Sequence, residues 1–218
     1  MNDISCVIVA CSKSSYHTEI TKQAIISSGV DCIIIETFSK INLYKEAKKT
    51  LFWHKEFNYN ACLNLGIMHT DTEYIALCNN DIVFTKDWTG ITDTMIKENV
   101  VSASPYSMYN QCRNGYTNDG TVHFGYQAGH EMCGWCIVIH NSIFKLIGKL
   151  DESQKFWCSD DAYADQLKAY GLKHMLDCGH VVNHIGGGSR TLNTLNRAKY
   201  VDFTINEYNR YQYAKTIK

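Results

Sequence analysis

The segment EYIALCNNDIVF begins as an apolar run and ends with Asn79, Asn80 and Asp81. Hard cations such as Mg²⁺ and Mn²⁺ prefer oxygen ligands, and proteins usually hold them with one or two carboxylates together with substrate phosphates. Asp81 is therefore a candidate metal ligand, and the two asparagines are candidate ligand-binding residues. A turn of Asn and Asp residues between two strands gives the same sequence, so the segment alone leaves both interpretations open.

The segment FWCSDDAYADQL places two adjacent carboxylates, Asp160 and Asp161, at the start of a predicted helix. Neighbouring side chains on a helix point in different directions, so the two cannot both face one cleft. A carboxylate in that position can act as a general base toward a hydroxyl group. Helix capping and a favourable interaction with the helix dipole explain the same pair without catalysis.

The segment VVNHIGGGSRT places His184 after a short apolar strand and before three glycines and Ser189. Backbone N–H groups in such a loop can approach phosphates closely because glycine carries no side chain. A flexible connector after an ordinary histidine gives the same pattern.

A competing site consists of Cys133 and Cys136, with Cys178 and His180 further along the chain. C-x-x-C with a further Cys and His is a zinc pattern, although the second pair does not have a standard zinc spacing. A redox pair of the thioredoxin type should open a helix, whereas this one runs directly into the apolar segment IVIH. The pattern predicts a structural zinc site as the alternative to the phosphate site.

The elements that position these residues alternate between strand and helix. SCVIVACS and VDCIIIE are short apolar runs typical of buried strands, and the segment between them has helical spacing and ends at Gly29. This order predicts an α/β fold in which a mostly parallel sheet is flanked by helices. The third strand, TEYIALCNN, ends at the candidate metal site, as expected where ligands bind at the carboxyl ends of parallel strands.

The composition of the chain argues against some classes of function and location. The 218 residues include 21 basic and 22 acidic side chains, so overall charge does not favour nucleic acid or an anionic membrane as partner. We expect one domain over residues 1–218, with 191–218 as a helical tail, and we expect no membrane span. The N-terminus does not resemble a signal peptide, and the ten cysteines are scattered through apolar strands, which predicts reduced thiols and a cytoplasmic location.

Taken in order, these segments resemble one known pattern, that of the GT-A glycosyltransferases and, within them, the family-2 inverting enzymes. That family opens with a strand, a helix and a second strand ending in an acidic residue, matched by SCVIVACS and CIIIE. It continues with an Asn-rich helix and a strand ending in an N-x-D motif, matched by YNACLNLGI and YIALCNNDIVF. The later matches are GWCIVI, IGKLDE, SDDAYADQL and HIGGGS, so the resemblance covers roughly residues 4–190.

The resemblance implies roles for individual residues. Glu36 would contact the nucleobase or ribose of a nucleotide-sugar donor, and Asp81 and His184 would bind the Mn²⁺ or Mg²⁺ that bridges the diphosphate. Asn79 stands where the family often has Asp, which bears on the affinity for metal. Asn60, Asn64 and Asn80 are further donor-binding candidates, because they lie on the Asn-rich helix and at the strand end.

Asp160 aligns best with the catalytic base of the family, and Asp161 is the fallback. The implied reaction transfers a sugar, with a UDP-linked donor expected, to an acceptor hydroxyl with inversion. The acceptor is a saccharide or, as in the phage enzymes that short members also resemble, a hydroxymethylated DNA base in the host cytoplasm. The aromatic and basic tail 191–218 is a candidate DNA contact, and packing of that tail against the domain is the alternative.

Two rivals remain at this stage. One is a zinc-stabilised, non-catalytic interaction protein, which would use the Cys/His set above. The other is a nucleotidyltransferase, which would release pyrophosphate from a nucleoside triphosphate. The sequence does not indicate the oligomeric state.

Overall fold

The computed structural model describes residues 3–185 together with Asn206, Asn209 and Tyr211. The predicted Gly/Ser loop at 186–189 lies outside the described residues. The predicted helical tail 191–218 does too, apart from those three residues. Tyr211 is buried, and its hydroxyl donates a hydrogen bond to Asp165.

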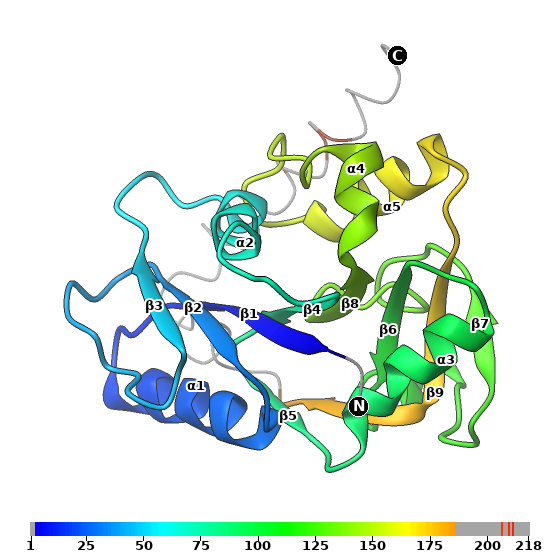
Figure 1. The fold of residues 1–218 in the computed structure, drawn as a ribbon, viewed down its shortest axis with the longest axis horizontal. Helices are drawn as coiled ribbons and strands as arrows, with labels where there is room; N and C mark the ends of the chain where they lie inside the picture. Colours follow the sequence, from blue (N-terminus) through cyan, green and yellow to red (C-terminus); the bar gives the residue numbers. More distant parts are fainter. Residues whose placement is uncertain (1–2, 186–205, 207–208, 210, 212–218) are drawn as a thin grey trace.

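The first half of the chain forms the predicted alternation of strands and helices (Figure 1). Its elements are β1 (Ile4–Ala10), α1 (Ser15–Ser28), β2 (Cys32–Glu36), β3 (Lys49–Phe52), α2 (Tyr59–Ile67) and β4 (Tyr74–Asn79). All seven residues of β1 and all five of β2 are buried, which explains why these strands are continuous apolar runs. Gly29 ends α1 in the left-handed conformation, with φ of 64°.

The second half contains shorter strands and supplies the other candidate residues. Its elements are β5 (Ile82–Phe84), α3 (Ile91–Lys97), β6 (Ser102–Tyr106), β7 (Val122–Phe124), β8 (Cys136–His140), α4 (Phe144–Ile147), α5 (Ser159–Ala169) and β9 (His174–His184). Single 3₁₀ turns occur at Trp88–Gly90, Cys112–Asn114 and Asn141–Ile143. The predicted helix at SDDAYADQLKAYG is α5, so Asp160 and Asp161 lie in its first turn.

The nine strands of the described chain form one mixed sheet with the order β3-β2-β1-β4-β8-β6-β9-β5, and β7 pairs with β9. The strands β3, β2, β1 and β4 are parallel, as predicted. The expectation of a mostly parallel sheet is met only in part. β6 and β9 are also parallel, but β8 runs antiparallel to both β4 and β6, and β5 and β7 run antiparallel to β9. Antiparallel neighbours need no crossover helix, and between β6 and β8 the structure has only a 3₁₀ turn and β7.

Helices cover both faces of the sheet (Figure 1). The helices α2, α4 and α5 lie on one face, and α1 and α3 lie on the other. Each face has its own core: Tyr59, Leu63 and Leu167 belong to one, and Ala24 and Met95 to the other. No helix among the described residues is long and apolar enough to cross a membrane.

Candidate active site

Two strand ends bring the predicted metal ligands together. Asn79 is the last residue of β4, and His184 is the last residue of β9. Pairing of Ile82 with His184 aligns β5 with β9, and Nε2 of His184 lies 3.1 Å from Oδ1 of Asp81. Asp81 is only 7% exposed. Asp81 and His184, which are far apart in the sequence, thus form a carboxylate–imidazole pair at the edge of the sheet.

Neighbouring residues hold the His184 ring in place. The Trp135 indole stacks on it with ring centroids 5.6 Å apart and an interplanar angle of 9°. Nδ1 of His184 lies 3.1 Å from the Asn110 amide, and a carboxamide can pair with either tautomer of histidine because it has a donor and an acceptor. Sequence reasoning singled out neither Trp135 nor Asn110 for a role. The one feature of the sequence that could have indicated a role for Trp135 is its place in the Gly-aromatic segment before β8.

The polar residues beside Asp81 point to different partners. The Asn79 carboxamide oxygen accepts a hydrogen bond of 2.8 Å from the Tyr59 hydroxyl. The Asn80 amide donates to Thr21 Oγ1 at 2.9 Å, so its side chain is directed toward α1. Among residues that the structure describes, no three His, Cys, Asp or Glu side chains could hold a metal together. Asp81 and His184 therefore fit a cation that takes its remaining ligands from substrate phosphates, and they do not fit an all-protein metal cage.

Asp160 is the second functional group of the site. It is half-buried in the first turn of α5, and its Oδ1 accepts a hydrogen bond of 3.0 Å from the Asp161 backbone N–H. Burial, together with the neighbouring charge of Asp161, raises the pKa of Asp160 from 3.8 to about 6. A carboxylate with a pKa near 6 is ionised at neutral pH and still accepts a proton readily, which suits a general base.

A small cavity of about 20 Å³ adjoins Asp160 and is large enough for one water molecule. Its lining comes from α2, β4, β8, α5 and the segments before β8 and α5, and comprises Tyr59, Asn60, Leu63, Leu77, Gly134, Ile137, Leu150, Ser159, Asp160 and Tyr163. Gly134 lies so close that a Cβ atom at this position would be 2.7 Å from Oδ2 of Asp160. The Gly-Trp segment thus contributes Gly134 on the side of Asp160 and Trp135 on the side of His184.

Tyr59 connects the two groups. It is buried at the start of α2, and it donates to Asn79 next to the metal pair. Burial raises the pKa of Tyr59 well above its usual range, and negative charge on Asp81 and Asp160 raises that pKa further. Tyr59 also lines the cavity beside Asp160, so one side chain contacts Asn79 at one strand end and adjoins the candidate base on α5. The sequence analysis did not assign Tyr59 a role.

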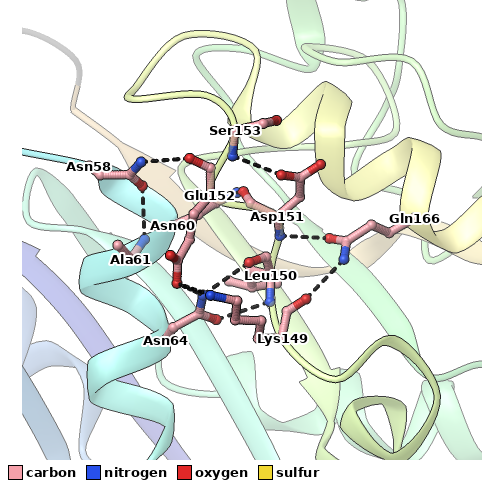
Figure 2. A network of polar contacts seen from close by, with 10 residues as sticks. All are labelled: Asn58, Asn60, Ala61, Asn64, Lys149, Leu150, Asp151, Glu152, Ser153 and Gln166. Atoms are coloured by element: carbon pink, nitrogen blue, oxygen red, sulfur yellow. Dashed lines mark hydrogen bonds and ion pairs between the residues drawn. The ribbon is translucent and has the colours of Figure 1, made fainter. Parts of the chain in front are cut away.

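The structure gives Asn60 and Asn64 a role different from the predicted donor contact (Figure 2). They do lie on one face of α2, as predicted from their spacing. The Asn60 amide donates to the Asp151 carbonyl at 2.7 Å, and the Asn64 amide donates to the Leu150 carbonyl at 3.0 Å. Their carboxamides hold the loop before α5, so the expected contact with a donor has no support in this geometry.

Glu36 also differs from its predicted role. Its carboxylate is 1% exposed at the end of β2 and accepts five hydrogen bonds from the protein. The donors are the backbone N–H groups of Ser12, Phe38 and Ser39 and the hydroxyls of Ser12 and Tyr44. Because these contacts occupy both oxygens, the geometry assigns Glu36 to fixing the loops after β1 and β2, and it does not support direct contact with a nucleobase.

The zinc alternative has no support in the described part of the chain. Cys133 Sγ accepts a hydrogen bond from the Gln111 amide at 2.7 Å, and His180 pairs with Asp177 at 2.8 Å. Cys136 Sγ lies 3.8 Å from Cys78 Sγ across β4 and β8. All ten cysteines are free thiols, so the C-x-x-C pair forms no disulfide here.

No protein-family model matches the chain, and no curated protein matches it either. The assignment of a function therefore depends on the sequence pattern and on the geometry of Asp81, His184 and Asp160.

Proposed function

We propose that this protein is an inverting glycosyltransferase of the GT-A type. It transfers a sugar from a nucleoside-diphosphate donor to an acceptor hydroxyl, with Mn²⁺ or Mg²⁺ assisting. The observation that carries this proposal is that Tyr59 lines the same cavity as Asp160 and donates to Asn79, two residues before Asp81 of the Asp81–His184 pair. A phosphate-binding cation and a general base are the two groups that such a displacement requires.

The position of the site in the sheet supports the proposal. Asn79 is the last residue of β4 and Asp81 follows it, at the carboxyl end of a strand that is hydrogen-bonded in parallel to β1. In open α/β sheets ligands bind outside the carboxyl ends of the strands. The loops after β1 and β2 leave the sheet at the same end, so a nucleotide seated there reaches the Asp81–His184 pair with its diphosphate.

In the proposed mechanism, Asp160 removes a proton from the acceptor hydroxyl. The hydroxyl oxygen then forms a bond to the anomeric carbon while the bond from that carbon to the diphosphate oxygen breaks, and the single displacement inverts the anomeric configuration. Asp81 and His184 would hold the cation, and a cation bound there would stabilise negative charge on the diphosphate. The stacked Trp135 ring and the Asn110 amide keep His184 oriented toward Asp81.

The acceptor is a saccharide or a hydroxymethylated DNA base, and either one presents the hydroxyl that Asp160 needs. The Tyr59 phenol fixes the Asn79 carboxamide beside the diphosphate site. Because Asn79 is neutral, this site carries one negative charge fewer than a site with two aspartates. We therefore expect weak binding of the cation alone and tighter binding together with the diphosphate.

Thermal unfolding of the purified chain tests the proposal. Nucleoside diphosphates and nucleotide sugars are added in turn, each with Mn²⁺ or with EDTA. A ligand at a hundredfold its dissociation constant stabilises the native state by about 2.7 kcal/mol. We expect a Mn²⁺-dependent rise in melting temperature with at least one nucleotide, and the loss of that rise in Asp81→Ala. If no nucleotide stabilises the wild-type protein, the proposal fails.

A nucleotidyltransferase is distinguished by its products. That enzyme releases pyrophosphate from a nucleoside triphosphate and transfers no sugar. A glycosyltransferase releases a nucleoside diphosphate from a nucleotide sugar, so chromatography of the nucleotide products separates the two activities.

A further inference from the structure

The loop at 149–153, which precedes α5, is bound to α2 through side-chain amides (Figure 2). Asn64 donates to the Leu150 carbonyl at 3.0 Å and to the Glu152 carboxylate at 2.8 Å. In return the Asn64 carboxamide oxygen accepts from the Leu150 N–H at 3.0 Å. A carboxamide has both a donor and an acceptor, so Asn64 can bond the N–H and the carbonyl of the same residue. The hydrogen bond from Asn64 also holds the pKa of Glu152 below its usual range.

Asn60 extends this contact to α5 itself. It is 3% exposed, and its amide donates to the Asp151 carbonyl at 2.7 Å. The same amide lies 3.5 Å from the carbonyl of Ser159, the residue before Asp160. One side chain of α2 therefore touches both the loop and the first residue of the helix that carries the proposed base.

A carboxamide on α5 holds the same loop from the other side. The Gln166 carboxamide oxygen accepts from the Asp151 N–H at 3.0 Å, and its amide donates to the Lys149 carbonyl at 2.9 Å. Figure 2 shows the loop between these two sets of amides. We call Asn60, Asn64 and Gln166 the amide clamp. It joins α2 to α5 through the backbone of a loop that belongs to neither helix.

The start of α5 has no side-chain cap at its N-cap residue, and the contact from Asn60 lies directly beside it. Cys158 occupies the N-cap position and makes no side-chain capping hydrogen bond, and its φ of 59° is a conformation that favours glycine. Residues such as Ser or Asp usually fix this position. The contact from Asn60 to Ser159 joins the first turn of α5 to α2, and the two bonds from Gln166 join a later turn of α5 to the same loop.

We propose that the amide clamp is a positioning device for Asp160, which sets the distance of its carboxylate from the end of β4. The role as a catalytic base rests on the proposed function, whereas the effect on the position of Asp160 does not. Asn60 and Gln166 act through the loop and the helix, so they are positioning residues and do not touch the reacting atoms. Misplacement of a reacting group by about 1 Å lowers a rate by roughly a hundredfold.

Isosteric variants test the clamp. Asn64→Asp and Gln166→Glu each keep the acceptor atom and replace the donor group with an oxygen. Asn141→Asp is the matched control, because Asn141 likewise donates to a backbone carbonyl, that of Thr72, at 2.9 Å before the start of β4. The measurements are the kcat and KM for donor turnover, and a carboxyl ¹³C NMR titration of Asp160, assigned by comparison with Asp160→Asn.

We expect the two clamp variants to lower kcat by about 10- to 100-fold and to leave the donor KM within about twofold, because donor contacts are unchanged. The titration midpoint of Asp160 should fall toward 3.8, since a displaced carboxylate is better solvated. The control should show neither change, even where it loses stability. Combining Asn64→Asp with Glu152→Gln returns a donor to this contact, so the double variant should recover part of kcat.

The possible results distinguish failure of the clamp proposal from failure of the proposed function. If folded Asn64→Asp and Gln166→Glu proteins retain the wild-type kcat and the wild-type titration midpoint, the clamp proposal is overturned. If the wild-type protein turns over no nucleotide sugar, the proposed function fails, and the titration alone then decides whether the clamp positions Asp160. If Asn64→Asp does not fold, Gln166→Glu and Gln166→Ala at the half-buried position on α5 carry the same test.

Discussion

Replacing Asp160 with Asn should abolish transfer and at the same time stabilise the protein. The pKa of Asp160 is about 6 in the folded state, against an ordinary value of 3.8. A raised folded-state pKa means that the ionised carboxylate destabilises the fold, and this cost grows between these two pH values and is complete above the higher one. At about 1.4 kcal/mol per pKa unit, the cost reaches about 3 kcal/mol above pH 7. Since Asp160 is half-buried, solvent screening reduces it to about 2 kcal/mol.

Urea unfolding of the wild-type protein and Asp160→Asn at pH 8 and pH 4 measures this difference. The Asn side chain keeps the oxygen that accepts from the Asp161 N–H, so the change removes mainly the charge. We expect the variant to be about 2 kcal/mol more stable at pH 8, with the gain almost lost at pH 4. Asp161→Asn is the control, which should keep most of the transfer activity. An equal or lower stability of Asp160→Asn at pH 8 would refute the reasoning, and so would full activity.

Four further results are expected. The kcat/KM of the wild-type enzyme should fall as pH drops through about 6, because protonated Asp160 cannot accept a proton; a flat profile from pH 5 to 8 would exclude this role. Gly134→Ala should lower kcat by tenfold or more, since its Cβ would lie 2.7 Å from the Asp160 carboxylate, and an unchanged kcat would show that the contact does not matter. His184→Ala should weaken Mn²⁺-dependent nucleotide binding by about tenfold or more in calorimetry; equal affinity with and without the imidazole would remove it from the metal site. Glu36→Ala should lower the free energy of unfolding by about 3 kcal/mol or more, because five donors lose their acceptor, and a change below about 1 kcal/mol in urea unfolding would contradict this.

The parts of the fold that the sequence predicted are those with a local signal. β1 and β2 are buried throughout, so each appears as an uninterrupted apolar run. By contrast β3, which pairs only with β2, lies at the edge of the sheet with half-exposed and exposed residues, and its segment KTLF carries no such run. Hydrophobic periodicity also could not predict the direction of β8, because an apolar strand has the same sequence pattern whether its neighbours are parallel or antiparallel.

The residues of the candidate site likewise include some that the sequence located correctly and some whose partners it did not reveal. Asp81 and His184 each follow an apolar run, and strand ends that meet at one edge of a sheet bring such residues together. The spacing of Asn60 and Asn64 correctly indicated one helix face, but a spacing does not reveal the partner. That partner is a loop 86 to 91 residues further along the chain. The partners of Glu36 were equally hidden from sequence reasoning. Its position at a strand end does not show that backbone N–H groups of the following loop donate hydrogen bonds to its carboxylate.

The most direct test of the central claim is release of nucleoside diphosphate from a panel of nucleotide sugars in the presence of Mn²⁺. Wild-type protein, Asp81→Ala and Asp160→Asn are compared, with saccharides and hydroxymethylated DNA as acceptors. We predict that the wild-type protein releases the diphosphate from at least one donor and transfers its sugar, that Asp160→Asn binds this donor without transfer, and that Asp81→Ala binds it poorly. Failure of the wild-type protein to consume any nucleotide sugar would contradict the assignment, as would equal transfer by Asp160→Asn.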